Sequence, residues 1–265
     1  MLIYRREWRQ NWKGLLIWTL ILSGLNAVQL SVYPQMAEQQ ESLDALLQSI
    51  PETIANVFHI GELDFSTIIG FYAIECYLIL TLFGSIYAAN LAAQIVAKEE
   101  SEKTIEFLLS KPVTRRRVLT EKGLLVLTNI LLFNLVISLI NLLVMALLDE
   151  TPDAETFLLI SVGPLLLHLT FAAVTFFLSV ILSKGRMLTS LSAGLVLLTY
   201  FLSVMSDLTD KLEWLKYVSP FAYVDPAGII LDHEIKPLYL LIMLTVTVLS
   251  LGAAYAIYNK KDITV

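Results

Sequence analysis

Long apolar stretches alternate with short polar stretches along the whole of this chain. Each apolar stretch holds roughly 20 residues or more, which is the length at which an α-helix crosses the ~30 Å hydrocarbon layer of a bilayer. The pattern therefore predicts an all-α membrane protein with a single transmembrane domain over residues 1–265. Six membrane-spanning helices are expected, at residues 14–37, 65–97, 124–148, 157–183, 187–206 and 237–259.

The composition supports a membrane protein and adds no sign of catalysis. Of 265 residues, 57% are hydrophobic and only 16% are charged, against about 25% charged in a typical soluble domain. The single cysteine, Cys76, lies in an apolar stretch, which excludes an intrachain disulfide and predicts a buried small residue. The sequence contains no phosphate-binding loop, nucleophile elbow or zinc-protease motif. We therefore expect no catalytic residue, metal site or nucleic-acid site on this chain.

The distribution of charge predicts the orientation in the membrane. If the connections between spans are numbered along the chain, the termini and the even-numbered connections hold 15 of the 18 Lys and Arg residues. The odd-numbered connections hold 16 of the 24 Asp and Glu residues. Because Lys and Arg concentrate on the cytoplasmic side of membrane proteins, both termini and the segment 98–117 are expected in the cytoplasm.

Two regions outside the spans have distinctive patterns. Residues 1–13 place Tyr4, Trp8 and Trp12 at four-residue spacing among Arg and Lys residues, which predicts a helix lying in the membrane interface. Residues 207–236 carry short apolar runs interrupted by prolines. This second region is expected to be either a broken, re-entrant pair of short helices in the outer leaflet or a plain surface loop.

Few polar residues fall inside the predicted spans. Glu75 is a candidate for the transport pathway or for gating, because a carboxylate inside a membrane is costly and often functional. Asn134, Ser138 and Asn141 recur at i, i+4 and i+7, a spacing that favours hydrogen bonds between helices. His168 has no spaced partner, which favours a core histidine over a metal ligand.

The cytoplasmic segment between the second and third spans is the most densely charged part of the chain. Within it Ile105, Leu108 and Leu109 recur at i, i+3 and i+4, which predicts a helix with one apolar face. Pro112 is expected to end that helix, and Thr114 to cap the helix that follows. A short helix of this kind outside the membrane is typical of a docking element.

The same segment resembles the cytoplasmic signature of ABC-2-type permeases, the membrane subunits of a large class of ATP-binding-cassette exporters. The matching run begins at Glu99 and continues, after four further residues, as Thr104-Ile105-Glu106-Phe107-Leu108-Leu109-Ser110-Lys111-Pro112-Val113-Thr114-Arg115. Lys103 stands where this family often has Gly. The basic aromatic N-terminus, the six spans and the broken segment before the last span extend the resemblance over nearly the whole chain.

The resemblance implies a permease that docks a separate ATPase through a coupling helix in the segment 98–117. Permeases of this kind work as two membrane subunits, identical or related, over two ATPase subunits that bind ATP and Mg²⁺. The docking residues implied here are Glu99, Glu102, Thr104, Ile105, Glu106, Leu108, Leu109, Lys111, Pro112 and Arg115. Their apolar members are expected to fill a groove on the ATPase, and their charged members to lie at its rim.

The function that the resemblance implies is ATP-driven export of a hydrophobic, peptide, lipid or drug-like cargo across a bacterial or archaeal cytoplasmic membrane. One alternative is a membrane-anchored sensor or assembly subunit that binds an ATPase without moving cargo. A further alternative, an intramembrane enzyme, is disfavoured by the missing catalytic motifs.

Overall fold

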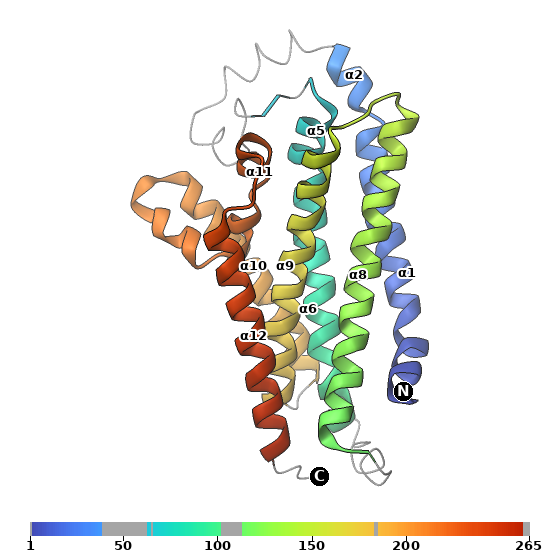
Figure 1. The fold of residues 1–265 in the computed structure, drawn as a ribbon, viewed down its shortest axis with the longest axis vertical. Helices are drawn as coiled ribbons and strands as arrows, with labels where there is room; N and C mark the ends of the chain where they lie inside the picture. Colours follow the sequence, from blue (N-terminus) through green and yellow to red (C-terminus); the bar gives the residue numbers. More distant parts are fainter. Residues whose placement is uncertain (1, 39–62, 65, 102–112, 183–184, 262–265) are drawn as a thin grey trace.

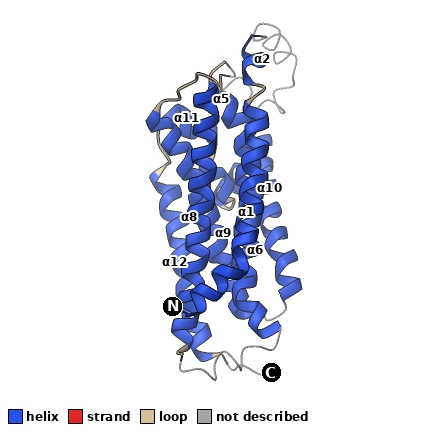
Figure 2. Ribbon diagram, turned by 90° about the vertical axis from the view of Figure 1, so that its right-hand side faces the viewer, coloured by secondary structure: helices blue, strands red, loops and turns tan. Residues whose placement is uncertain are grey.

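The protein is a bundle of long helices. A computed structural model describes residues 2–38, 63–64, 66–101, 113–182 and 185–261. Within these residues every regular element is helical, as Figure 2 shows. The helices are α1 (Leu2–Leu30), α2 (Tyr33–Glu38), α5 (Ile68–Phe71), η1 (Tyr72–Cys76), α6 (Tyr77–Ser101), α8 (Arg115–Leu147), α9 (Ala154–Ile181), α10 (Gly185–Leu208), η2 (Asp210–Tyr217), η3 (Pro220–Val224), α11 (Pro226–Asp232) and α12 (Pro237–Lys260).

Six helical stretches are long and apolar enough to cross a membrane, so the protein is a multi-pass membrane protein. Each stretch overlaps one span predicted from the sequence, which confirms the number and order of the spans. The second stretch is built from α5, the π-helical η1 and α6 in succession. The third begins at Arg115, because the Thr114 side chain caps α8 by accepting a hydrogen bond of 3.3 Å from the Arg117 amide.

Helix α1 is continuous from Leu2 to Leu30, so residues 2–13 do not form the separate interfacial helix that the sequence predicts. Glycine at the expected boundary costs a helix only about 1 kcal/mol, which packing at both ends outweighs. Tyr4 and Trp8 stack on each other with ring centroids 6.4 Å apart, and both rings pack against the hydrophobic core. Only Trp12 of the three predicted interfacial aromatics is clearly exposed.

Helices α6 and α9 form the centre of the bundle, with the other long helices around them (Figure 1). In their most apolar 18-residue windows, 61% and 50% of residues are buried, against 33% or less in the other four spans. Alanines on several sides of α6 (Ala88, Ala89, Ala92 and Ala93) are buried, and small residues of this kind let neighbouring helices approach closely. Helix α1 packs on α8, and α12 packs on α9.

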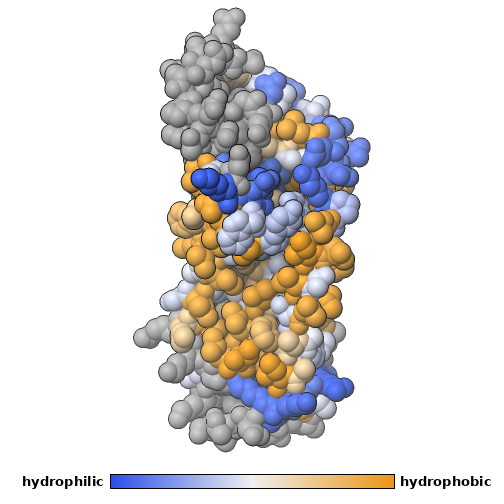
Figure 3. Space-filling model, turned by 90° about the vertical axis from the view of Figure 1, so that its left-hand side faces the viewer, coloured by the Kyte–Doolittle hydropathy of each residue, from blue (hydrophilic) through white to orange (hydrophobic). Residues whose placement is uncertain are grey.

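The surface of the bundle matches a bilayer. Figure 3 shows apolar side chains in a broad band, with hydrophilic side chains above and below it. On α12 the side chains of Leu241, Leu244, Val248 and Leu249 are all exposed, as expected of residues that face lipid. The start of α1 and the end of α12 lie at the same end of the bundle (Figure 1), as an even number of spans requires.

The segment between α10 and α12 is divided into three short helices, η2, η3 and α11. It packs back against the ends of the long helices. The Ser219 hydroxyl donates a hydrogen bond of 2.7 Å to the carbonyl of Thr199 in α10, and the Tyr77 hydroxyl of α6 donates one of 2.8 Å to the carbonyl of Val224. Asp225 caps α11 by accepting from the Gly228 amide at 2.8 Å.

Candidate functional site

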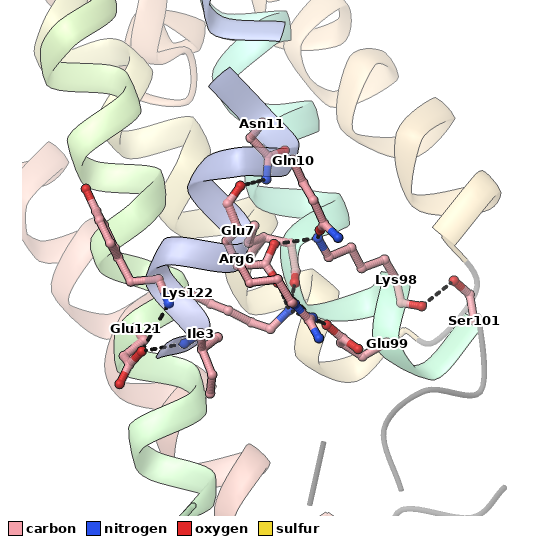
Figure 4. A network of polar contacts seen from close by, with 12 residues as sticks. Ile3, Arg6, Glu7, Gln10, Asn11, Lys98, Glu99, Ser101, Glu121 and Lys122 are labelled. Carbon is pink, nitrogen blue, oxygen red and sulfur yellow. Dashed lines mark hydrogen bonds and ion pairs between the residues drawn. The ribbon is translucent and has the colours of Figure 1, made fainter. Parts of the chain in front are cut away.

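Charged side chains from three helices meet where the start of α1, the end of α6 and the first turns of α8 converge (Figure 4). We call this group the basal ionic network. Its members are Arg6 and Glu7 of α1, Lys98 and Glu99 of α6, and Lys122 of α8.

The Glu7 carboxylate is the centre of the basal ionic network and is fully buried. Its Oε1 atom lies 3.1 Å from Nη2 of Arg6 and 3.2 Å from Nζ of Lys122. Its Oε2 atom accepts a hydrogen bond from the ammonium group of Lys98. A single acidic residue on α1 therefore binds cations from its own helix, from α6 and from α8.

Lys122 is the most deeply buried cation of the basal ionic network, with its side chain only 1% exposed. Besides Glu7, its Nζ atom lies 3.3 Å from Oε1 of Glu99 and donates to the carbonyl of Ile95. Glu99 also pairs with Arg6. The three protons of the ammonium group thus have three acceptors on two other helices.

The energetics of such a cluster are asymmetric. Taking charges out of water costs about as much as their mutual attraction returns, so a buried ion pair adds little net stability. Removing one partner, however, leaves a buried charge uncompensated and costs about 3–5 kcal/mol. The basal ionic network therefore favours the observed arrangement of the three helix ends, in which both Glu7 and Lys122 have partners of opposite charge.

Glu121, next to Lys122 on α8, holds the beginning of α1. Its Oε2 atom accepts hydrogen bonds of 3.0 Å from the amides of both Ile3 and Tyr4, and Arg117 donates to its Oε1 atom at 2.9 Å. The first amides of a helix have no acceptor within the helix, and negative charge is favourable there. The Glu121 side chain of α8 thus caps the N-terminus of α1 and fixes the first turn of α1 against α8.

The structure places two of the docking residues that the resemblance implies. Glu99 lies inside the basal ionic network and is 2% exposed, which corrects its expected position at an exposed rim: Arg6 and Lys122 approach from two other helices and cover it. Arg115 donates to the carbonyl of Lys261 at 2.5 Å and ties the start of α8 to the end of α12. The other residues lie outside the described part of the chain: Glu102, Thr104, Ile105, Glu106, Leu108, Leu109, Lys111 and Pro112.

Glu75, the predicted pathway residue, lies in the π-helical η1 and its side chain is exposed on the bundle surface rather than buried inside. Its backbone carbonyl accepts a hydrogen bond of 3.1 Å from the Gln29 side chain of α1. A carboxylate on the surface of a membrane-spanning stretch is costly if lipid surrounds it. The position is therefore suited to a contact with water or with another protein chain.

Asn90 and Gln94 are polar residues of α6 that lie, along the chain, between Glu75 and the basal ionic network. Asn90 accepts from Ser192 of α10 at 2.7 Å, and Gln94 donates to Thr189 of α10 at 3.1 Å. On their other side they line a groove between α6 and α1 with a volume of about 300 Å³. The surface of α6 between α1 and α10 is thus partly polar and hollowed.

Two of the three polar residues predicted on the third span, Asn134 and Asn141, join helices, as the sequence predicts. Asn134 of α8 lies 3.1 Å from Nδ1 of His168 in α9. Asn141 donates to the Tyr72 hydroxyl at 3.2 Å and accepts from Asn26 of α1 at 3.4 Å. His168 is fully buried, which confirms its expected place in the core. Among the described residues, no group of three His, Cys, Asp or Glu side chains is arranged to hold a metal ion.

Sequence reasoning missed Glu7, Lys98, Glu121 and Lys122 as members of a site, since it counted the Lys residues only as signs of orientation. A signal was nevertheless present. Lys98-Glu99 and Glu121-Lys122 are adjacent opposite charges at the ends of the second and third spans that flank the predicted docking segment, and Arg6-Glu7 is a similar pair before the first span. Three such pairs at the same level of a bundle indicate charges that compensate one another.

A family model described as ABC-2 family transporter protein matches residues 1–263, almost the entire chain. No curated protein matches the sequence.

Proposed function

We propose, from the premise that this chain belongs to the ABC-2 family of transporter proteins, that it is the membrane-spanning subunit of an ATP-driven exporter. The observation that carries the proposal furthest is the basal ionic network. It holds together the ends of α1, α6 and α8, and the predicted docking segment joins α6 to α8. The membrane in question would be the cytoplasmic membrane of a bacterium or archaeon.

The basal ionic network would couple movement of the docking segment to movement of the membrane helices. In this proposal an ATPase subunit binds the segment 102–112, and ATP binding and hydrolysis with Mg²⁺ occur on that partner. A force on the segment reaches α6 through Ser101 and α8 through Val113. Because α1 is joined to both helices by buried charges, the three helices would tilt as one body. Rigid-body movement of this kind is a common route from a local event to a two-state transition.

The cargo route is the second part of the proposal. We assign the surface of α6 between α1 and α10 to the contact with a second permease, identical or related. Asn90 and Gln94 lie on this side of α6, and Glu75 of η1 is exposed and contacts α1 through its backbone carbonyl. Polar groups at membrane depth are costly against lipid. Between two permeases the same residues would line a route for a hydrophobic, peptide, lipid or drug-like cargo.

The alternative is a sensor or assembly subunit that binds an ATPase without moving cargo. It shares the docking step with the exporter and differs in whether ATPase binding leads to transport. An exporter predicts that cargo stimulates ATP hydrolysis by the reconstituted complex in proteoliposomes. A sensor predicts ATPase binding with no such stimulation by any cargo. The partly polar surface of α6 favours the exporter, because a sensor has no need of polar groups along a spanning helix.

The docking step can be tested with single substitutions. We expect Leu108→Asp and Leu109→Asp to leave membrane insertion intact but to reduce co-purification of the ATPase subunit at least about tenfold, because a charge replaces an apolar side chain in a buried contact. Leu147→Asp is the matched control, since Leu147 is 74% exposed at the opposite end of the bundle. Unchanged co-purification of both docking variants would contradict ATPase binding through this segment.

A further inference from the structure

A second polar feature lies at the end of the bundle opposite the basal ionic network. There the structure encloses a cavity of about 460 Å³ between the beginning of α6, the end of α10, the short helices η2, η3 and α11, and the start of α12. This volume falls within the range of about 300–1,000 Å³ that is usual for pockets binding small organic molecules. None of its lining residues belongs to the docking segment or to the polar surface of α6 described above.

Aromatic rings form much of the cavity wall. They belong to Tyr77, Tyr200, Phe221, Tyr223 and Tyr239. Tyr223 stacks on Tyr239 with ring centroids 4.8 Å apart, and Tyr200 meets Phe221 edge to face at 5.6 Å. Rings fixed in this way lose little conformational freedom when a ligand binds.

The charged residues of the cavity are unequal in sign. Four carboxylates and two lysines line it, so that two negative charges are in excess: Asp207, Glu213, Asp225 and Glu234 against Lys216 and Lys236. Lys216 lies 3.7 Å from Asp207, and Lys236 lies 3.7 Å from Asp232, which is outside the lining. Among the described residues, neither Glu213 nor Glu234 has an ion-pair partner. Both side chains are exposed and therefore mark the open side of the cavity.

Hydrogen bonds from side-chain hydroxyls to the backbone fix the elements around the cavity. The Ser219 hydroxyl donates to the Thr199 carbonyl and the Tyr77 hydroxyl to the Val224 carbonyl, which fixes the two ends of η3 against α10 and α6. The Asp225 cap fixes the first turn of α11. The aromatic and acidic side chains consequently line a cavity whose walls are fixed by contacts within the chain.

From this combination we propose that the cavity binds an amphipathic organic cation, a molecule with an apolar or aromatic body and a positively charged ammonium or phosphonium centre. The body would lie against the aromatic wall, where the face of a ring attracts a cation. The charge would be drawn to the mouth by Glu213 and Glu234, since a cleft of one sign with apolar walls concentrates the opposite charge. An anionic ligand, including an anionic lipid headgroup, is disfavoured by the same excess of carboxylates.

Binding at this cavity involves only this chain and can be measured without an ATPase. The full chain is reconstituted in nanodiscs and dialysed against radiolabelled tetraphenylphosphonium, with empty nanodiscs subtracted. Tetraphenylborate, which has nearly the same shape and the opposite charge, is the matched control ligand. We expect saturable binding of the phosphonium that tetraphenylborate does not displace, and a phosphonium affinity that falls as salt is added.

Substitutions locate the binding. The double variant Glu213→Gln with Glu234→Gln should weaken phosphonium binding about tenfold, the effect of losing two exposed ion pairs of about 0.7 kcal/mol each. Tyr239→Leu, which keeps apolar bulk but removes a π face, should weaken it several-fold. Glu155→Gln, an exposed acid at the same end that does not line the cavity, should have no effect. Equal binding of both ions, or no effect of the double variant, would overturn the proposal.

Discussion

At the scale of single residues, Lys122 shows how a membrane protein can bury a charge near its surface. Its side chain is 1% exposed, and Glu7, Glu99 and the Ile95 carbonyl surround its ammonium group. Each of these groups would be costly to bury without the others. The cluster is therefore favourable only when every buried charge has its partners. Removing one member is the best test of this.

We expect Lys122→Met to lower the free energy of unfolding by about 3 kcal/mol, because two buried carboxylates lose a cation that they share. Adding Glu7→Gln should cost less than the sum of the single changes, since the excess negative charge is removed. The measurement is thermal unfolding in detergent. Arg9→Gln is the control, because Arg9 is exposed and lies two residues after Glu7 on α1. It should shift the free energy of unfolding by no more than about 0.5 kcal/mol. Unchanged stability of Lys122→Met would argue against a coupled network.

At the scale of elements, the two central helices α6 and α9 pack tightly against each other at Gly84. A Cβ atom added to Gly84 of α6 would lie 2.5 Å from Nε2 of His168 in α9. The His168 ring is fully buried and lies 3.1 Å from Asn134, so it has no room to withdraw. The absence of a side chain at Gly84 thus allows the two central helices to meet around His168.

This packing predicts opposite effects for one substitution at two positions. Gly84→Ala should destabilise the bundle by about 1–3 kcal/mol through overpacking. Gly194→Ala in α10 should stabilise it by up to about 1 kcal/mol, because alanine favours helix and nothing lies within 4 Å of the added carbon. Thermal unfolding of the two variants under the same conditions compares them directly. A stabilising Gly84→Ala would mean that α6 and α9 are not so closely packed.

Element-scale features were predictable to different degrees. The spans followed from hydropathy because lipid demands long runs of apolar residues, and the Thr114 cap followed from local chemistry. The continuous course of α1 from residue 2 into the first span did not follow from the sequence. An interfacial helix and an extended first span have the same local pattern. The basal ionic network was also missed, because Glu7 and Lys122 are brought together by tertiary packing over more than a hundred residues of sequence.

At the scale of the whole molecule, the bundle has distinct features at its two ends. The basal ionic network ties three helices together beside the predicted docking segment. The opposite end holds an aromatic, acid-rimmed cavity built largely from the broken segment before α12. Helix α6 reaches both ends and is central to the bundle, so a tilt imposed at its base would also change the cavity at its beginning. In the proposed exporter, α6 would thereby connect the docking segment at one end of the bundle with the cavity at the other.

The central claim is that this chain is one of two permeases over a pair of ATPase subunits. It is tested most directly by affinity purification of the native complex in mild detergent, followed by determination of its intact mass. The expected particle contains two permease chains, of 29.7 kDa each if identical, and two copies of an ATPase subunit. A particle that holds this chain without any ATPase, or with only one permease, would contradict the account.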